Sequence, residues 1–276
     1  MRVAILQMTS GVDPAQNAAT VVAAIRDARA AGADMLFTPE MSGLLDSNRE
    51  RAAANLKDTD SDVVLAAVRA AAAEVGLWVH IGSLALKGER ADGRLVNRGL
   101  VIDDTGVIRA HYDKMHLFDV DLPTGESWRE SAAYAPGERS VVVETPWAPI
   151  GLSVCYDLRF SELYRQLSGG GAKILTVPAA FTVPTGRAHW HTLLRARAIE
   201  SACFVIAAAQ SGTHEDGRET YGHSLVIDPW GEVLLDMGEG AGLAFADLDL
   251  ARLDDVRTRI PVLAHRRPIP APEERR

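Results

Sequence analysis

The stretch IGLSVCYDLRFSELYRQLSGGGAKILTVPAA, residues 150–180, consists of two apolar runs separated by a more polar segment. Both apolar runs have the composition of buried strands. The segment between them, FSELYRQLSGGG, is typical of a helix that glycines terminate. A strand, a helix and a second strand in this order indicate a parallel unit of an α/β sheet. We therefore predict an α/β fold.

The same alternation extends over the rest of the chain. A strand at 2–8 precedes a helix with Asp13 as its N-cap, Pro14 at its first position and Gly32 at its end. Hairpins between such units favour a mixed sheet, or two sheets, flanked by helices. The other predicted elements are strands at 34–40, 77–84, 173–180 and 203–210, helices at 60–75 (capped by Asp60) and 187–202, and hairpins turning at 103–106 and 228–231.

The composition is that of a globular protein with one large domain. The chain has 276 residues, of which 47% are hydrophobic and 24% charged, with a formal net charge of −8. This charge argues against nucleic-acid binding, and no apolar window is long enough for a membrane helix. We expect a domain over 1–268, a mobile tail over 269–276, and a cytoplasmic protein without a signal peptide.

The two cysteines, Cys155 and Cys203, do not occur in a zinc-binding pattern. Free thiols fit a cytoplasmic protein, and Cys203 within an apolar strand is expected to be an inert core residue. His189 and His191 lie two residues apart in a predicted helix, so they do not share a face. We therefore predict no metal site.

Three chemically active residues each follow a predicted strand: Glu40, Lys114 and Cys155. Carboxyl ends of strands form the usual ligand crevice of α/β sheets, so the three side chains could converge there. A buried carboxylate can take the thiol proton, and an ammonium can stabilise an oxyanion. A cysteine–histidine pair using His189, His191 or His223 is an alternative, although no feature selects one histidine.

Three blocks around these residues, FTPEM, YDKMHLFDVDLP and GLSVCYDLRFSELY, resemble the nitrilase superfamily of carbon–nitrogen hydrolases. TGRAHWHTLLRARAIE, YGHSLVIDPWGEV and RIPVLAHRRP are similar to its Nit-type amidase branch. The resemblance implies a single-domain αββα sandwich without a cofactor. It further implies Glu40 as general base, Lys114 as oxyanion stabiliser, Cys155 as nucleophile and Glu130 as a fourth site residue. Family members associate through helices, which implies a homodimer or higher homo-oligomer.

The resemblance also narrows the reaction. Tyr156-Asp157 after the cysteine is similar to amidases, whereas nitrilases usually carry Trp-Glu there. The stretch CFVIAAAQSGTHEDGRETYGHSLVIDPWG looks more like amidases that act on deaminated glutathione than like ω-amidases. A small amide substrate is implied. The alternatives are an ω-amidase acting on 2-oxoglutaramate, an N-carbamoyl or aliphatic nitrile hydrolase, and a binding protein without activity.

Five further residues are candidates for substrate contacts. The backbone N–H of Tyr156 is expected to be a second oxyanion donor. Arg159 could pair with Glu162 or with a substrate carboxylate, which bidentate arginine suits, and Arg187 is an equivalent candidate. Phe181 and Thr182, after the strand at 173–180, are expected to line the pocket.

Overall fold

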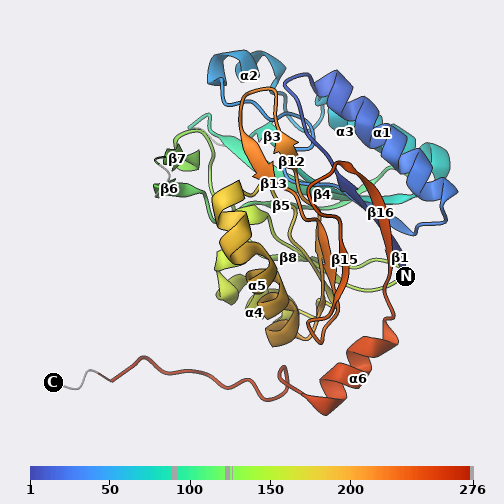
Figure 1. Ribbon diagram of the computed structural model, residues 1–276, viewed down its shortest axis with the longest axis vertical. Coiled ribbons are helices and arrows are strands. Elements are labelled where there is room, and N and C mark those ends of the chain that lie inside the picture. Colours follow the sequence, from blue (N-terminus) through green and yellow to red (C-terminus); the bar gives the residue numbers. More distant parts are fainter. Residues whose placement is uncertain (89–91, 122–124, 126, 274–276) are drawn as a thin grey trace.

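The computed structural model describes residues 1–88, 92–121, 125 and 127–273, which contain two six-stranded sheets (Figure 1). Each sheet has three parallel central strands with antiparallel strands at its edges. The first has the order β16-β1-β2-β3-β4-β5, with β1 (Arg2–Gln7), β2 (Met35–Phe37), β3 (Trp78–Lys87), β4 (Leu95–Ile102), β5 (Ile108–Asp113) and β16 (Gly242–Asp247). The second has the order β15-β14-β11-β10-β9-β8, with β8 (Val141–Val143), β9 (Ile150–Leu152), β10 (Ile174–Thr176), β11 (Phe204–Ala207), β14 (Leu225–Ile227) and β15 (Val233–Asp236).

Helices cover the outer face of each sheet. Figure 1 shows α1 (Pro14–Ala30) and α3 (Val63–Val75) on the first sheet. On the second sheet lie α4 (Ser161–Gly169) and α5 (Val183–Ser201). This is the αββα sandwich that the resemblance implied, and the predicted fold class is confirmed.

The alternation along β1 explains why two sheets stack beneath helices. Val3 and Ile5 belong to the core that includes the second sheet, whereas Ala4 and Leu6 pack with the residues of α1 and α3. All four side chains are buried. Successive side chains of a strand point to opposite faces, so a strand that is apolar throughout needs cover on both sides.

Several predicted boundaries differ from the structure. The helix predicted over 60–75 begins after Asp62 instead of Asp60, because the Asp62 carboxylate accepts a hydrogen bond from the Leu65 N–H. The helix predicted over 187–202 begins at Val183, with Pro184 in its first turn. The strand predicted over 173–180 ends as a regular strand at Thr176, and the following residues lead into the site.

Several short elements were not predicted, and three of them are an α-helix and two hairpins. They are α2 (Arg49–Asn55), the hairpin of β6 (Asp119–Asp121) and β7 (Ser127–Arg129), and the hairpin of β12 (Ser211–Thr213) and β13 (Glu219–Tyr221). Such short segments carry too few residues for a hydrophobic period to show. All three contribute residues to the pocket described below.

One buried histidine in the first sheet makes stability depend on pH. His80 on β3 is 1% exposed and lies beside Phe37, with ring centroids 5.7 Å apart. Burial lowers the pKa of His80 to about 3. As the pH falls below the unfolded value of about 6.5, the unfolded chain binds a proton that the folded chain does not.

We therefore expect the free energy of unfolding to fall by about 2 kcal/mol between pH 7 and pH 5 through His80 alone. Urea unfolding at both pH values measures this loss. His80→Leu removes the titrating group, so the variant should lose correspondingly less stability over the same interval. An equal loss in the variant and the parent protein would contradict the assignment.

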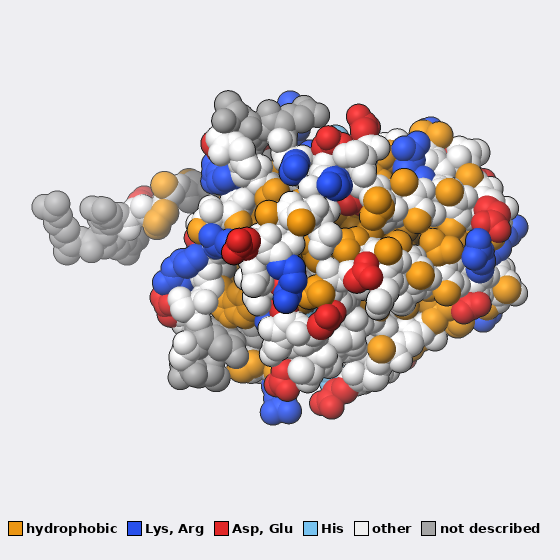
Figure 2. Space-filling model, turned by 90° about the horizontal axis from the view of Figure 1, so that it is seen from above, with side chains coloured by type: hydrophobic (Ala, Val, Ile, Leu, Met, Phe, Trp, Pro, Cys, Tyr) orange, Lys and Arg blue, Asp and Glu red, His pale blue; other side chains and the backbone are white. Residues whose placement is uncertain are grey.

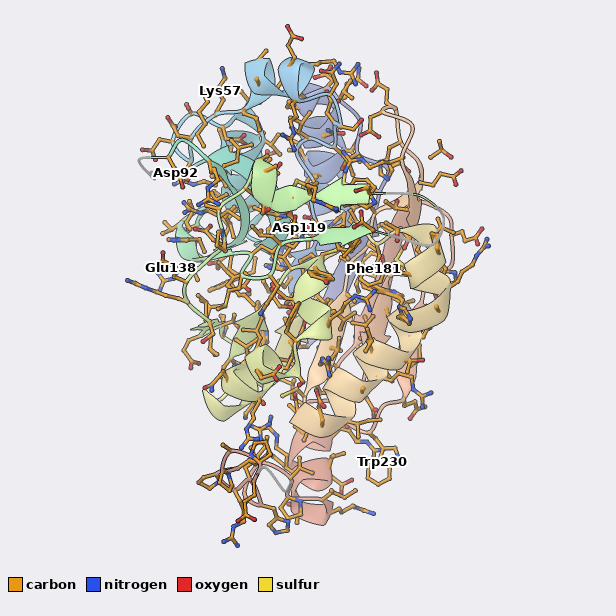
Figure 3. The ribbon with its side chains drawn as sticks, turned by 90° about the vertical axis from the view of Figure 1, so that its left-hand side faces the viewer. Lys57, Asp92, Asp119, Glu138, Phe181 and Trp230 are labelled. Carbon is orange, nitrogen blue, oxygen red and sulfur yellow. The ribbon has the colours of Figure 1, made fainter. Side chains whose placement is uncertain are left out.

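The two ends of α5 lie in different surroundings. Figure 3 shows Phe181 at the N-terminal end of this helix and Trp230 at its opposite end. Phe181 is buried, whereas Trp230, in the turn before β15, is 50% exposed. The pocket lies at the Phe181 end.

After β16 the chain forms α6 (Ala251–Arg259) and then runs away from the sandwich (Figure 1). Arg266 still contacts α4, because its guanidinium donates to the Arg165 carbonyl and to Ser168 Oγ. The domain limits of 1–268 and the mobility of 269–276 stay predictions, and residues 274–276 lie outside the described part of the chain.

One face of the molecule carries charges of both signs. On the face seen in Figure 2, Lys and Arg side chains are interspersed with Asp and Glu. None of the helices in the described ranges combines the length and the hydropathy that crossing a bilayer requires.

Candidate active site

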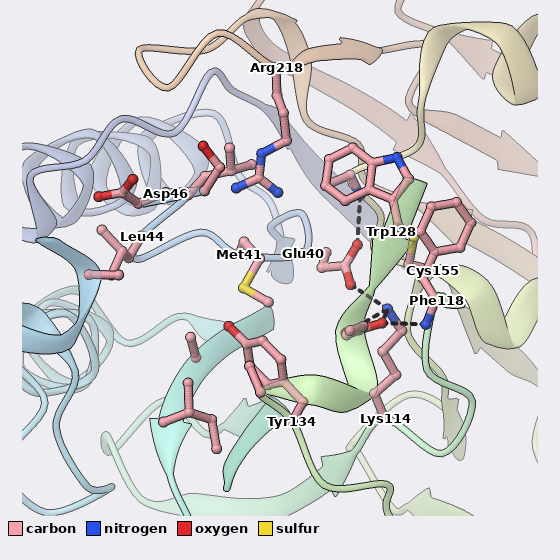
Figure 4. Close-up of a pocket in the computed structure, with 18 of the residues that line it drawn as sticks. Glu40, Met41, Leu44, Asp46, Lys114, Phe118, Trp128, Tyr134, Cys155 and Arg218 are labelled. Atoms are coloured by element: carbon pink, nitrogen blue, oxygen red, sulfur yellow. Dashed lines mark hydrogen bonds and ion pairs between the residues drawn. The ribbon is translucent and has the colours of Figure 1, made fainter. Parts of the chain in front are cut away.

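The structure brings together four side chains that are far apart in the sequence (Figure 4). Glu40 follows β2, Lys114 follows β5, and Cys155 follows β9 as the first residue of the short 3-10 helix η2 (Cys155–Arg159). Glu130 begins a second 3-10 helix, η1 (Glu130–Ala132), directly after β7. All four line one pocket.

Glu40 is the centre of this cluster. Its Oε1 accepts hydrogen bonds of 2.9 Å from Lys114 Nζ and from Asn97 Nδ2, and its Oε2 accepts one of 2.8 Å from the Ala180 N–H. The Cys155 thiol interacts with this carboxylate as well. Burial raises the pKa of Glu40, but the Lys114 ammonium and these hydrogen bonds hold it below its usual value. Glu40 is therefore an ionised base beside the thiol.

Lys114 lies between two carboxylates. Its Nζ is 2.9 Å from Glu40 Oε1, 2.9 Å from Glu130 Oε2 and 3.1 Å from Glu130 Oε1. Burial lowers the pKa of Lys114, but the charges of Glu130 and Glu40 outweigh it and raise the pKa well above the ordinary value. The ammonium is thus charged, buried and fixed in position.

Asn97 is a site residue that the sequence analysis missed. Its Nδ2 donates to Glu40 Oε1 at 2.9 Å and to Glu130 Oε1 at 3.2 Å, so it joins the two carboxylates. Its Oδ1 is buried without a hydrogen-bond partner among the described residues. The only indication of Asn97 in the sequence was an amide side chain within the largely apolar stretch LVNRGLVI of β4, because a buried amide needs hydrogen-bond partners.

Cys155 is 7% exposed and carries a protonated thiol in the resting site. Burial and the charge of Glu40 raise the pKa of this thiol well above its ordinary value, although Lys114 lowers it. Glu40 can accept the thiol proton when the sulfur attacks an electrophile. A carboxylate is thus in place to act as the base.

The turn that presents Cys155 is strained and held by Asp157. Cys155 has a φ of 51°, in the left-handed region that few non-glycine residues adopt. The fully buried Asp157 carboxylate accepts hydrogen bonds from the Tyr112 hydroxyl at 2.8 Å, the Val154 N–H at 2.9 Å and the His116 N–H at 3.0 Å. Asp157 thereby connects the turn at Cys155 to the chain segment that carries Lys114.

Gly82 allows segments of the two sheets to pack closely beside the site. A Cβ atom at this position of β3 would overlap the Thr38 carbonyl, the Pro39 carbonyl carbon and the Pro178 side chain. The close approach brings the segment before Glu40 against the segment after β10, whose Ala180 N–H binds Glu40. Glycine is required here for space.

The pocket has a volume of about 740 Å³. Three of the predicted substrate-contact residues, Tyr156, Phe181 and Thr182, line it. Within the described residues, Arg159 and Arg187 are absent from the lining. Arg159 lies over the rings of Tyr156 and Phe181 and contacts His189 instead of Glu162, and Arg187 is exposed on α5.

The three histidines considered as alternative bases, His189, His191 and His223, are likewise absent from the pocket lining in the described ranges. His191 Nε2 and His223 Nδ1 instead contact the Asp236 carboxylate at 3.0 and 2.9 Å. His191, His223 and Asp236 each have one possible metal-ligand atom, and these three atoms lie within 4.8 Å of one another. The spacing of the residues in the sequence did not predict this group. These hydrogen bonds account for the cluster, and the absence of a metal stays a prediction.

Both cysteines are free thiols, and they differ in their surroundings. Cys203 is fully buried, and its Sγ donates to the carbonyls of Ala172 and Ser201. Burial raises the pKa of Cys203 to about 11. Only Cys155 of these two lies beside both a carboxylate and an ammonium, which suits nucleophilic attack on a carbonyl or nitrile carbon.

Comparison with known proteins shows the family of the chain. A family model described as carbon-nitrogen hydrolase matches residues 2–258. The deaminated glutathione amidase of Bos taurus is 41% identical over 269 residues, which cover 96% of this chain and 82% of the bovine protein. The crystal structure of the NitFhit protein of C. elegans has a TM-score of 0.89 and 39% identity, covering 96% of this chain and 65% of that one.

A second solved structure resembles the chain less closely. It is a mutant of the amidase from Nesterenkonia sp. AN1 whose active-site cysteine carries acrylamide added by a Michael reaction. Its TM-score is 0.77 at 28% identity, with 95% of this chain and 98% of that one covered.

The family match extends over nearly the whole chain and includes Glu40, Lys114, Glu130 and Cys155. The enzyme class that the sequence predicted, a carbon–nitrogen hydrolase of the amidase type, is confirmed. This chain belongs to the carbon–nitrogen hydrolase family.

Proposed function

We propose that the chain hydrolyses the γ-amide bond of deaminated glutathione, releasing 2-oxoglutarate and cysteinylglycine, with Cys155 as nucleophile. The observation that carries the proposal is the buried pair of Lys114 Nζ and Glu40 Oε1, 2.9 Å apart, in the same pocket as the Cys155 thiol on which both charges act. A thiol, a base and a fixed cation are the groups that acyl transfer through a thioester requires. The substrate rests on the amidases of that name that the chain is similar to.

In the first half of the reaction, Cys155 Sγ bonds to the amide carbonyl carbon while its proton moves to Glu40. The carbonyl oxygen becomes an oxyanion, which the Lys114 ammonium and the Tyr156 backbone N–H stabilise. When the intermediate collapses, the carbon–nitrogen bond breaks and the proton moves from Glu40 to the leaving amine. A thioester on Cys155 remains.

In the second half, water attacks the thioester and gives a proton to Glu40. The carbon–sulfur bond then breaks, the proton returns to the sulfur, and the carboxylic acid leaves. Glu130 holds Lys114 through two hydrogen bonds and helps to position this water. The chemistry uses only groups of this chain and water.

Rates on four substrates test the proposal. We expect kcat/KM on deaminated glutathione to exceed that on 2-oxoglutaramate, on an N-carbamoyl amino acid and on an aliphatic nitrile by at least about tenfold, since the substrate's extra contacts act in the transition state. Preference for 2-oxoglutaramate would make the enzyme an ω-amidase. Preference for either of the last two would refute the amidase assignment, and no turnover of any of them would favour a binding protein.

Two further features stay predictions that accompany this function. Self-association through helices near the nucleophile turn is expected, and size-exclusion chromatography with light scattering measures it. A cytoplasmic location fits the two free thiols, Cys155 and Cys203. Fractionation of the source cells would test the location.

A further inference from the structure

The pocket contains a cation that the proposed chemistry does not use. Arg218, just before β13, lines the pocket together with Glu40 and Cys155. Figure 4 shows its side chain pointing into the pocket from the side opposite to Lys114. The side chain is 26% exposed, so it is neither fully solvated nor enclosed.

A buried carboxylate holds Arg218 in place. Its Nε and Nη2 each lie 2.8 Å from Oδ2 of Asp216, whose side chain is fully buried. Asp216 also accepts hydrogen bonds from the N–H groups of Ser47, at 2.7 Å, and Arg218, at 3.0 Å. Burial raises the pKa of Asp216, but its hydrogen bonds with Arg218 hold it below its usual value. The carboxylate therefore stays charged and fixes the guanidinium.

An aromatic ring restricts the guanidinium further. Its central carbon lies 5.4 Å from the ring centroid of Trp128 on β7, which also lines the pocket. Among the described residues, Nη1 of Arg218 makes no hydrogen bond. A preorganised arginine with an unused donor edge suits a carboxylate, because its planar fork matches the two oxygens.

Other cations near the site are less suited to binding a carboxylate. Lys114 lies between Glu40 and Glu130, and Arg129 forms two hydrogen bonds of 2.9 Å with the exposed Asp121. Arg49 and Lys87 also line the pocket, but they are exposed to solvent, which weakens a charge pair.

We propose that Arg218, held by Asp216, is the residue that binds a carboxylate of the substrate. The inference rests on the proposed function and specifies the substrate class as anionic amides. Deaminated glutathione has two carboxylates, one on the 2-oxo acid that becomes the acyl group and one at the end of the leaving dipeptide. Either can supply the anion, and substrates that differ in these groups distinguish them.

The test is Arg218→Gln, which keeps hydrogen-bonding capacity and removes the charge. We expect KM for deaminated glutathione to rise about 10- to 100-fold with kcat within about threefold, the behaviour of lost ground-state binding. A neutral primary amide, butyramide, should show no change. Equal losses on butyramide, or no change on any substrate, would overturn the proposal.

A second substrate identifies the carboxylate. 2-Oxoglutaramate has the acyl-side carboxylate and releases only ammonia. A KM increase on both anionic substrates assigns Arg218 to the 2-oxo acid, whereas an increase on deaminated glutathione alone assigns it to the dipeptide. Both results support the proposal.

Arg187→Gln is the matched control, because Arg187 is an exposed arginine outside the pocket lining. It should leave KM unchanged on every substrate, and a larger effect there than at Arg218 would refute the assignment. Asp216→Asn should raise KM for the anionic substrates less than Arg218→Gln does, since it loosens the guanidinium without removing it. Thermal melting of each variant excludes unfolding as the cause.

Direct binding separates this inference from the proposed function. Titration calorimetry of glutarate and of cysteinylglycine into Cys155→Ala protein reports anion binding without turnover, because each compound has one of the two candidate carboxylates. Adding Arg218→Gln should weaken binding of one of the two compounds at least about tenfold, whether or not deaminated glutathione is the substrate. Unchanged affinity for both compounds would contradict the anion site and leave the proposed function untouched.

Discussion

Cys155→Ala is expected to abolish amide hydrolysis while the protein stays folded. Loss of a nucleophile costs on the order of 10⁶ in kcat in a serine protease, and here Glu40 and Lys114 would have no thiol to assist. The free energy of unfolding should change by only about 1 kcal/mol, because one buried sulfur atom is removed. Steady-state rates and urea unfolding measure the two quantities.

Cys203→Ala is the control for this result. Cys203 is also a buried free thiol, but its Sγ donates to the carbonyls of Ala172 and Ser201 and accepts from Arg257 Nη2 at 3.4 Å. Its removal should cost similar stability and leave kcat unchanged. Mass spectrometry of the parent enzyme quenched during turnover should detect an acyl group on Cys155. Activity of Cys155→Ala near the parent rate would refute the thioester mechanism.

Glu40→Gln should lower kcat about 10³- to 10⁴-fold, the upper range for loss of a general base. The amide has one acceptor oxygen, whereas Glu40 accepts from Lys114 at Oε1 and from Ala180 at Oε2. One of these donors would therefore face an NH₂ group. The variant therefore loses the base and one of the hydrogen bonds that fix the side chain at position 40.

The same variant should make Cys155 easier to alkylate at neutral pH. The charge of Glu40 raises the pKa of the Cys155 thiol and Lys114 lowers it, so removing the carboxylate lowers this pKa. Lys114→Met should shift it in the opposite direction. Iodoacetamide labelling as a function of pH measures both shifts. Profiles that move together, or that do not move, would show that these charges do not control the thiol.

The meeting of Glu40, Lys114 and Cys155 in one pocket could be predicted from sequence because each residue is embedded in a contiguous block. The run before Cys155 forms β9 and its turn forms η2, as the apolar pattern and the polar residues after it indicate. Glu40 and Lys114 similarly follow β2 and β5. Local sequence specifies strand ends, and strand ends are where α/β proteins place ligands.

The other parts of the site depend on contacts between distant segments. Asn97 joins Glu40 to Glu130 from the middle of a strand, where apolar patterning assigns it no role. Arg218 is positioned by Asp216 and by Trp128. Trp128 lies on a hairpin 90 residues earlier in the chain. No periodicity relates such positions, so the sequence instead suggested Arg159 and Arg187 because of their nearness to the cysteine block and the helix.

The sequence by itself determined the αββα class and the family, and it singled out Glu40, Lys114 and Cys155 as candidates, because these follow from local periodicity and contiguous motifs. Only the tertiary structure decided which residues share the pocket with them. Two sheets must stack before Glu40 reaches the Ala180 N–H from the opposite sheet. Short hairpins must then fold over the strand ends before Trp128 and Arg218 meet. The stacking buries Glu40 and Lys114, which a single strand would leave in water. In these buried surroundings the charges of the carboxylate and the ammonium shift the pKa of each other and of the Cys155 thiol.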